Sequence, residues 1–184
     1  MTLVKPVLLI ALGAFALAGC AETPSGPMLA PTQQPPPILV APPSSNFDPA
    51  QFAWSTRAGA NSLQGLLQFR RGGARYTCAG GDVLLTPETP WSRRRMVILY
   101  GSAFAAAVPV SIVRARTPSA GAGDYARYVR RTTCDAQDHF SFEGLPDGAW
   151  YVITVGKAVD GSGEPLAITR RIETRGGART VVLS

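Results

Sequence analysis

From residue 57 onward the sequence is a series of short strand-like runs, each ended by Gly, Pro or Asp. The strongest run, residues 150–155 (WYVITV), consists of the aromatic and β-branched residue types that favour strands. The chain has 184 residues, of which 46% are hydrophobic, enough for one globular domain. Several strands at short spacing, with turn residues between them, predict an all-β sandwich over residues 57–184.

The other expected strands are shorter or less regular. Phe140 and Phe142 are two positions apart, so both rings enter the same face of the core. In the run AITRRIET the inward residues are Ile168 and Ile172, and Arg170 between them is an exception. That run covers residues 167–174, and the remaining runs cover residues 62–70, 82–86, 125–133 and 179–183.

Residues 88–128 depart from the strand pattern and form an insertion. Ser92 is expected to cap a short helix, SRRRMVILYG, in which Met96, Leu99 and Tyr100 fall on one face. The next run, VPVSIVRA at residues 108–115, predicts a further strand, and SAGAG at residues 119–123 predicts a loop. The expected fold is therefore a sandwich with a short helical insertion.

The segment TCDAQDHFSFEGLPDGAWYVITV, residues 133–155, resembles the carboxypeptidase regulatory-like domain. In the family pattern a turn precedes an alternating F-x-F strand, an LP-G connection and a Y-x-V strand. Asp138 and His139 stand where the family usually has Gly, and the insertion is also atypical. The resemblance implies a transthyretin-related, Ig-like sandwich of seven strands. The matching residues are Asp135, Phe140, Phe142, Leu145, Pro146, Gly148, Tyr151, Ile153 and Val155.

The amino terminus has the pattern of an export signal. Lys5 precedes the run VLLIALGAFALA, whose 12 residues fall short of the ~20 that a membrane-spanning helix needs. The run ends in LAGC, which resembles a lipobox. This resemblance implies that residues 1–19 are removed and that Cys20 carries acyl chains that hold the protein in a membrane. Ala21, in place of an Asp, favours the outer membrane with the body facing the periplasm, and the inner membrane and cell surface are alternatives.

A proline-rich tether is expected over residues 20–56. Nine prolines between positions 24 and 49 each fix φ and remove a backbone donor, so neither helix nor sheet propagates. A proline-rich ligand for the groove of a partner is the alternative to a disordered spacer. Phe47, Phe52 and Trp54 are unlike a spacer, and they are expected either to pack on the body or to begin its first strand.

Two cysteines remain once Cys20 is assigned to the anchor. Cys78 and Cys134 are an even pair, which in an oxidising periplasm predicts a disulfide. Free thiols and a redox role are the alternatives, and no C-x-x-C motif supports the redox role.

Catalytic and metal chemistry have few candidate residues. His139, the single histidine, lies in a turn with Asp135, Asp138 and Glu143, at spacings that match no known metal motif. Ser141 is two positions away on an extended segment that faces opposite the core rings. We therefore expect no metal, no cofactor and no enzymatic activity.

Basic residues supply a candidate contact patch. Arg93, Arg94 and Arg95 form the only run of three charges, and Arg130 with Arg131 forms a pair. Such a patch could meet lipid phosphates, peptidoglycan carboxylates or an acidic protein. Scattered solvated positions are the alternative, and a periplasmic location argues against nucleic acid.

These features predict a non-catalytic, membrane-anchored envelope lipoprotein whose sandwich is a structural or protein-interaction module. Its partner would be an envelope protein or peptidoglycan. The alternative is a lipoprotein that binds a glycan, peptidoglycan or a peptide. A deep apolar pocket with converging polar groups would favour this alternative over flat faces.

Overall fold

The computed structural model describes residues 46–118 and 123–184. The expected signal peptide, Cys20 and most of the tether lie outside the described residues. The described elements, in chain order, are η1 (Pro49–Thr56), β1 (Asn61–Leu67), β2 (Arg70–Arg71), β3 (Ala74–Thr77), β4 (Asp82–Pro87), α1 (Pro90–Tyr100), β5 (Ala105–Pro109), α2 (Val110–Arg116), η2 (Gly123–Tyr128), β6 (Arg130–Thr133), β7 (His139–Leu145), β8 (Gly148–Ala158), β9 (Leu166–Thr174) and β10 (Ala178–Leu183).

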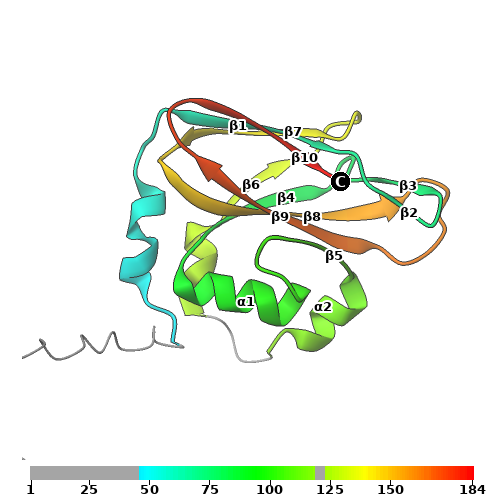
Figure 1. Cartoon of the computed structure of the whole chain (residues 1–184), viewed down its shortest axis with the longest axis horizontal. Coiled ribbons are helices and arrows are strands. Elements are labelled where there is room, and N and C mark those ends of the chain that lie inside the picture. Colours follow the sequence, from blue (N-terminus) through cyan, green and yellow to red (C-terminus); the bar gives the residue numbers. More distant parts are fainter. Residues whose placement is uncertain (1–45, 119–122) are drawn as a thin grey trace, which may run out of the picture. The chain divides into compact units, whose positions relative to one another are not determined.

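These strands form two facing sheets (Figure 1). In the smaller sheet, β1 lies between β10, which is parallel to it, and the antiparallel β7. In the larger sheet, β8 lies between β9 and β4, and β6 extends the sheet beyond β4. The seven strands named so far make the sandwich, and β2, β3 and β5 are additions at the edges of the larger sheet. The prediction of an all-β sandwich with a short helical insertion is confirmed.

The core lies between the two sheets and follows the alternation of each strand. Phe140 and Phe142 are both buried, as their spacing predicted. Trp150 is fully buried and donates its indole N–H to Thr174 Oγ1 at 3.0 Å, so its one polar atom is satisfied. The other large buried side chains of the core include Leu63, Val83, Leu85, Leu145, Val152, Ile168 and Leu183.

The helical insertion covers the face of the larger sheet that points away from the smaller one (Figure 1). Its first helix, α1, begins at Pro90, and Thr89 is the N-cap. Thr89 Oγ1 accepts the N–H of Ser92 at 3.1 Å, and Ser92 Oγ accepts the N–H of Thr89 at 2.8 Å. The expectation that Ser92 is the cap is wrong, because Ser92 is the third helical residue of a reciprocal capping box. Met96 and Leu99 are buried, as the helix pattern predicted.

The strand expected over residues 108–115 is also wrong. The chain pairs with β9 only over β5, and residues 110–116 turn into α2. Glu164 Oε1 accepts the N–H of Ser111 at 2.8 Å, which satisfies one of the donors left free at a helix start. Similarly, only residues 130–133 of the expected strand 125–133 are extended, because η2 occupies Gly123–Tyr128.

The last residues of the expected tether pack on the body. Asp48 caps η1, and Phe52 in this helix is fully buried. The ring of Phe52 lies 5.1 Å from that of Tyr128, and the ring of Trp54 lies 4.8 Å from that of Trp150. These aromatic residues therefore pack on the body and do not begin its first strand, because β1 starts only at Asn61.

Candidate functional site

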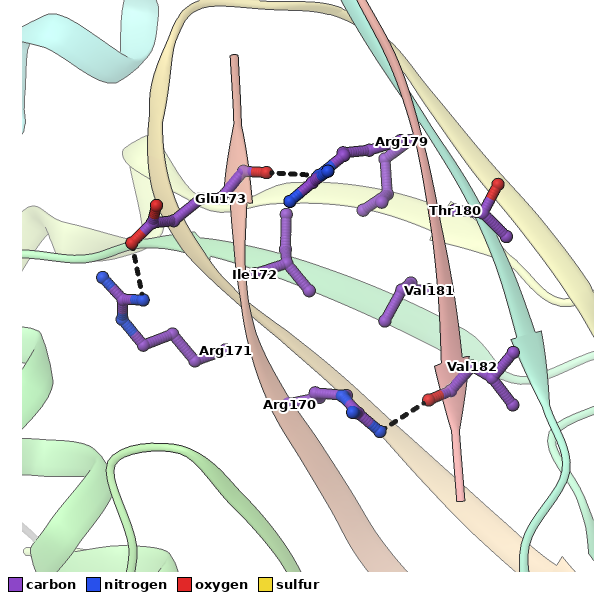
Figure 2. A pocket seen from close by; sticks show the side chains of 9 residues that line it. Arg170, Arg171, Ile172, Glu173, Arg179, Thr180, Val181 and Val182 are labelled. Carbon is purple, nitrogen blue, oxygen red and sulfur yellow. Dashed lines mark hydrogen bonds and ion pairs between the residues drawn. The ribbon is translucent and has the colours of Figure 1, made fainter.

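An open cleft of about 470 Å³ lies between β9 and β10, at the edge where the two sheets part (Figure 2). Arg170 donates to the Val182 carbonyl at 2.9 Å, and Arg179 donates to the Glu173 carbonyl at 3.2 Å. Each guanidinium therefore bridges the two sheets, which explains why Arg170 interrupts the apolar face of its strand.

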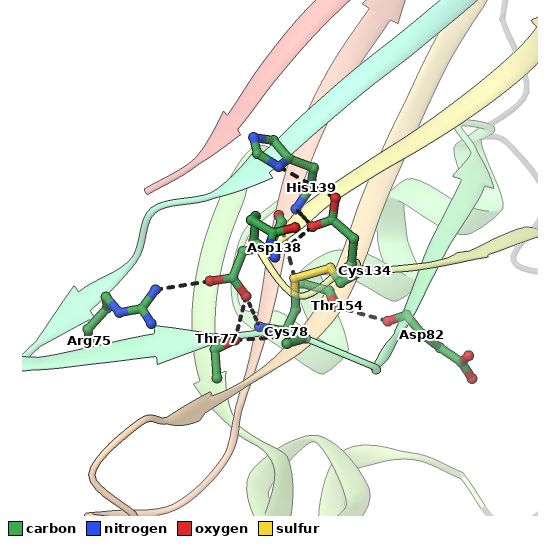
Figure 3. The surroundings of a disulfide bond; sticks show 11 residues. Arg75, Thr77, Cys78, Asp82, Cys134, Asp138, His139 and Thr154 are labelled. Carbon is green, nitrogen blue, oxygen red and sulfur yellow. Dashed lines mark hydrogen bonds and ion pairs between the residues drawn. A yellow bond between two sulfur atoms is a disulfide. The ribbon is translucent and has the colours of Figure 1, made fainter.

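The predicted disulfide joins Cys78 and Cys134, both buried (Figure 3). Asp138 next to it is buried, with a φ of 68°, and occupies the left-handed position where the domain pattern that this segment resembles usually has Gly. Its carboxylate accepts hydrogen bonds from Thr77 Oγ1, from Cys78 N and from Arg75 Nη1. Asp138 is thus committed to holding β3 against the turn before β7.

The remaining members of the cluster around His139 stay in solvent. His139 Nδ1 lies 3.6 Å from Asp135 Oδ2, and both side chains are more than half exposed. The backbone N–H of His139, with that of Gln137, lowers the pKa of Asp135 by hydrogen bonding to its ionised form. Within residues 46–118 and 123–184 no three His, Cys, Asp or Glu side chains lie close enough to hold a metal ion.

Four of the five arginines of the predicted contact patch contact separate partners. Arg93 binds Glu88 at 2.7 Å, and Arg95 lies over the ring of Trp91. Arg94 is on the same helix, α1. In β6, successive side chains point to opposite faces. Arg130 accordingly donates to the Ser55 carbonyl at 3.1 Å, and Arg131 lies 3.7 Å from Asp82. Arg130 and Arg131 therefore reach different partners from opposite faces of β6.

Glu88 lies at the centre of a cluster of polar side chains that the sequence analysis did not identify. Its carboxylate accepts Arg93 Nη1 at 2.7 Å, Arg171 Nε at 2.6 Å and the Tyr151 hydroxyl at 3.0 Å. Burial and this hydrogen bond to Glu88 raise the pKa of Tyr151, so the phenol is a donor at neutral pH. The cluster fastens α1 to the larger sheet.

A second hollow, of about 670 Å³, lies where three loops meet at one end of the sandwich. We call it the loop hollow. It combines the segment between η1 and β1, the connection between β7 and β8, and the turn between β9 and β10. The residues that line it are Trp54, Arg57, Ala58, Gly59, Ala60, Asn61, Pro146, Asp147, Gly176 and Gly177.

Asn61 organises the floor of the loop hollow. It is only 3% exposed, and its amide nitrogen donates to the Leu145 carbonyl and to Asp147 Oδ1, both at 2.9 Å. Its amide oxygen accepts the N–H of Gly177 at 2.7 Å. One buried side chain thus ties the three loops together. Asp147 is held by one oxygen, and its Oδ2 accepts no hydrogen bond from the described residues.

Trp54 and Arg57 supply the wall and the charge of the loop hollow. Trp54 packs against Trp150, and its ring lies so close to Gly148 that any Cβ there would overlap it. The exposed Arg57 side chain makes no hydrogen bond or ion pair with the described residues. A fixed aromatic wall, an oriented carboxylate and an available guanidinium can together bind a ligand that has an apolar face and polar rims.

None of the described helices combines the length and hydropathy needed to cross a bilayer.

Comparison with known proteins supports the fold. No family model and no curated protein matches the chain. Among solved structures, a candidate carbohydrate-binding protein from Pseudomonas aeruginosa is similar, with a TM-score of 0.55 and 21% sequence identity. The match covers 74% of this chain and 96% of that one. At this identity the likeness shows a shared fold, and we conclude that the described body is a β-sandwich of the same architecture.

Proposed function

We propose that this protein is a non-catalytic, membrane-anchored lipoprotein of the cell envelope whose sandwich binds a glycan in the loop hollow. The observation that carries the proposal is the pairing of a fixed aromatic wall, Trp54, with a carboxylate, Asp147, that a buried amide holds in place. Sugar rings present C–H faces that stack on aromatic rings. Their hydroxyls are donors to carboxylates, and charge-assisted hydrogen bonds of this kind are stronger than neutral ones.

The size and openness of the site favour a polymer over a small buried ligand. At about 670 Å³ the loop hollow has the volume of ligand pockets, which is about 300–1,000 Å³. It is bounded by three loops, so a chain of sugars could lie across it. The description of the similar Pseudomonas protein as a candidate carbohydrate binder supports the same ligand class.

Peptidoglycan is the glycan that best fits the remaining features. Its carboxylates complement Arg57, whose guanidinium can bind a carboxylate through two parallel hydrogen bonds. Acylation of Cys20 would place the body in the periplasm at the outer membrane, within reach of the cell wall. The proline-rich residues before 46 would act as the spacer.

Binding to soluble peptidoglycan fragments tests the site. In calorimetric titrations of the full acylated protein in detergent, Arg57→Gln and Asp147→Asn should each weaken binding about tenfold. Asp147→Asn keeps the oxygen that accepts from Asn61, so the loops should stay in place. Arg71→Gln in β2 is the matched control, because Arg71 is also exposed and lies outside the hollow. Unchanged affinity in both site variants would refute the assignment.

The anchor is tested separately. Cys20→Ser should abolish incorporation of labelled fatty acid, and a variant that still incorporates label would exclude Cys20 as the acylated residue.

A second function, protein interaction, is favoured by the outer edge of β10. In the described chain β10 pairs only with β1, so one edge remains unpaired beside the cleft of Figure 2. An acidic strand of an envelope protein could add to this edge. A photo-crosslinking residue in place of Thr180 should then capture one protein in intact envelopes, while the same residue in place of Arg71 should not. Equal labelling at both positions would contradict this function.

A further inference from the structure

We infer that the helical insertion docks on the surface of an anionic phospholipid bilayer. This inference goes beyond the glycan site and does not depend on it. The insertion, residues 88–128, contains six arginines, one aspartate and one glutamate, a net charge of +4. The whole chain carries +6. Most of the net positive charge is therefore gathered in one segment.

The same segment carries most of the large apolar side chains that the body leaves in solvent. Six such residues exist in the described chain, and four belong to the insertion. Val97 is 49% exposed, Ile98 61%, Phe104 63% and Ile112 40%. The other two are Val155 and Val159 in and after β8. Apolar residues gathered on one surface generally mark a binding face.

Arginines lie beside several of these exposed apolar side chains. Arg93 and Val97 are four residues apart on α1 and are neighbours on the helix surface. The guanidinium of Arg93 lies 5.2 Å from the centre of the Phe104 ring. On α2, Ile112 is followed by the exposed Arg114 in the last turn. We call Val97, Ile98, Phe104 and Ile112, with Arg93 and Arg114, the insertion face.

The two helices that carry the insertion face belong to one layer. α1 packs against α2, and Arg116 Nη1 donates to the Leu99 carbonyl at 3.2 Å, which joins the ends of the two helices. Both lie on the outer face of the larger sheet (Figure 1). This combination is typical of segments at a membrane interface, where apolar side chains enter the acyl boundary and arginines reach the headgroups.

The point at which the chain enters the body also lies close to the insertion that would face the bilayer. Phe47, the second described residue, has its ring 5.5 Å from that of Trp91 in α1. The chain therefore enters the described body beside the insertion. An anchor at Cys20 would raise the local concentration of this face at the bilayer, although the face should bind without acylation.

Vesicle sedimentation of the unacylated chain tests the inference. Residues 21–184, exported with an unrelated cleavable signal so that the disulfide forms, contain the complete core of the described body. This protein should sediment with vesicles of equal parts phosphatidylglycerol and phosphatidylcholine, and much less with phosphatidylcholine alone. Because each basic residue near an anionic surface contributes about fivefold in affinity, Arg114→Gln should raise the Kd about fivefold.

The apolar contribution needs its own variant and control. Val97→Ser combined with Ile98→Ser should raise the Kd at least about tenfold, because both side chains are exposed and leave the core intact. Val159→Ser and Arg71→Gln are the matched controls outside the insertion, and they should bind as the unsubstituted protein does.

Three results would overturn the inference. One is an absence of sedimentation with the anionic vesicles. Another is equal loss of binding in the control variants. The third is a dimer in size-exclusion chromatography that Val97→Ser with Ile98→Ser converts to a monomer, which would make the face an interface between two copies of the chain.

Discussion

Reducing the disulfide should lower the stability of the body by about 4 kcal/mol. Cys78 and Cys134 are separated by 56 residues, and closing a loop of that length removes about 4 kcal/mol of chain entropy from the unfolded state. Both residues are 2% exposed, so replacing them with Ala also removes two buried sulfur atoms, at about 1 kcal/mol each. The double variant Cys78→Ala with Cys134→Ala should therefore lose about 6 kcal/mol.

Urea unfolding followed by tryptophan fluorescence separates the two contributions. With a slope of about 2 kcal/mol per molar urea, the midpoint should fall about 2 M on reduction and about 3 M in the double variant. Reduced and oxidised protein have the same side chains, so the difference between them isolates loop closure. Reductant should leave the midpoint of the double variant unchanged. A reduced protein within about 1 kcal/mol of the oxidised one would refute the entropic argument.

Three further perturbations address packing, a buried carboxylate and pH. Gly65→Ala should destabilise the body by about 1–3 kcal/mol in urea unfolding, because its Cβ would overlap the Phe140 ring. Asp138→Ala should cost about 3 kcal/mol or more, since it leaves buried donors unpaired at a left-handed residue, and Asp138→Asn should cost less. The backbone N–H of His139 lowers the pKa of Asp135 in the folded state. Ionised Asp135 therefore stabilises the fold above the ordinary pKa of an Asp, and this stabilisation is lost as pH falls below about 4. The urea midpoint should fall less steeply over that range in Asp135→Asn, and an identical pH profile would contradict this assignment.

Strands with strong local patterns could be predicted from the sequence. The alternation of Phe140 and Phe142 placed both rings in the core, and the aromatic and β-branched run at residues 150–155 is the middle of β8. In these segments local propensity and tertiary burial agree. Asp138 also tolerates the left-handed conformation that the family resemblance implied for its position.

Weakly patterned segments could not be predicted, because partners distant in sequence decide them. Residues 105–109, rich in Ala, form a strand because the edge of β9 offers hydrogen bonds. The β-branched residues that follow form a helix, whose start Glu164 supports. The loop hollow depends on Asn61 and Asp147, which are 86 residues apart, and no pattern in the sequence connects them. The insertion face likewise exists only once α1 and α2 are packed.

The parallel pairing of β1 with β10 has a consequence for when this chain can fold. Asn61 and Gly177, at the start of that pairing, are 116 residues apart and bond directly. The central strand of the smaller sheet thus lacks one neighbour until β10 has been synthesised, and such non-local pairing makes folding slow. For a chain with the export signal expected here, this ordering would keep the body unfolded, and so competent for translocation, until its final strand emerges on the far side of the membrane.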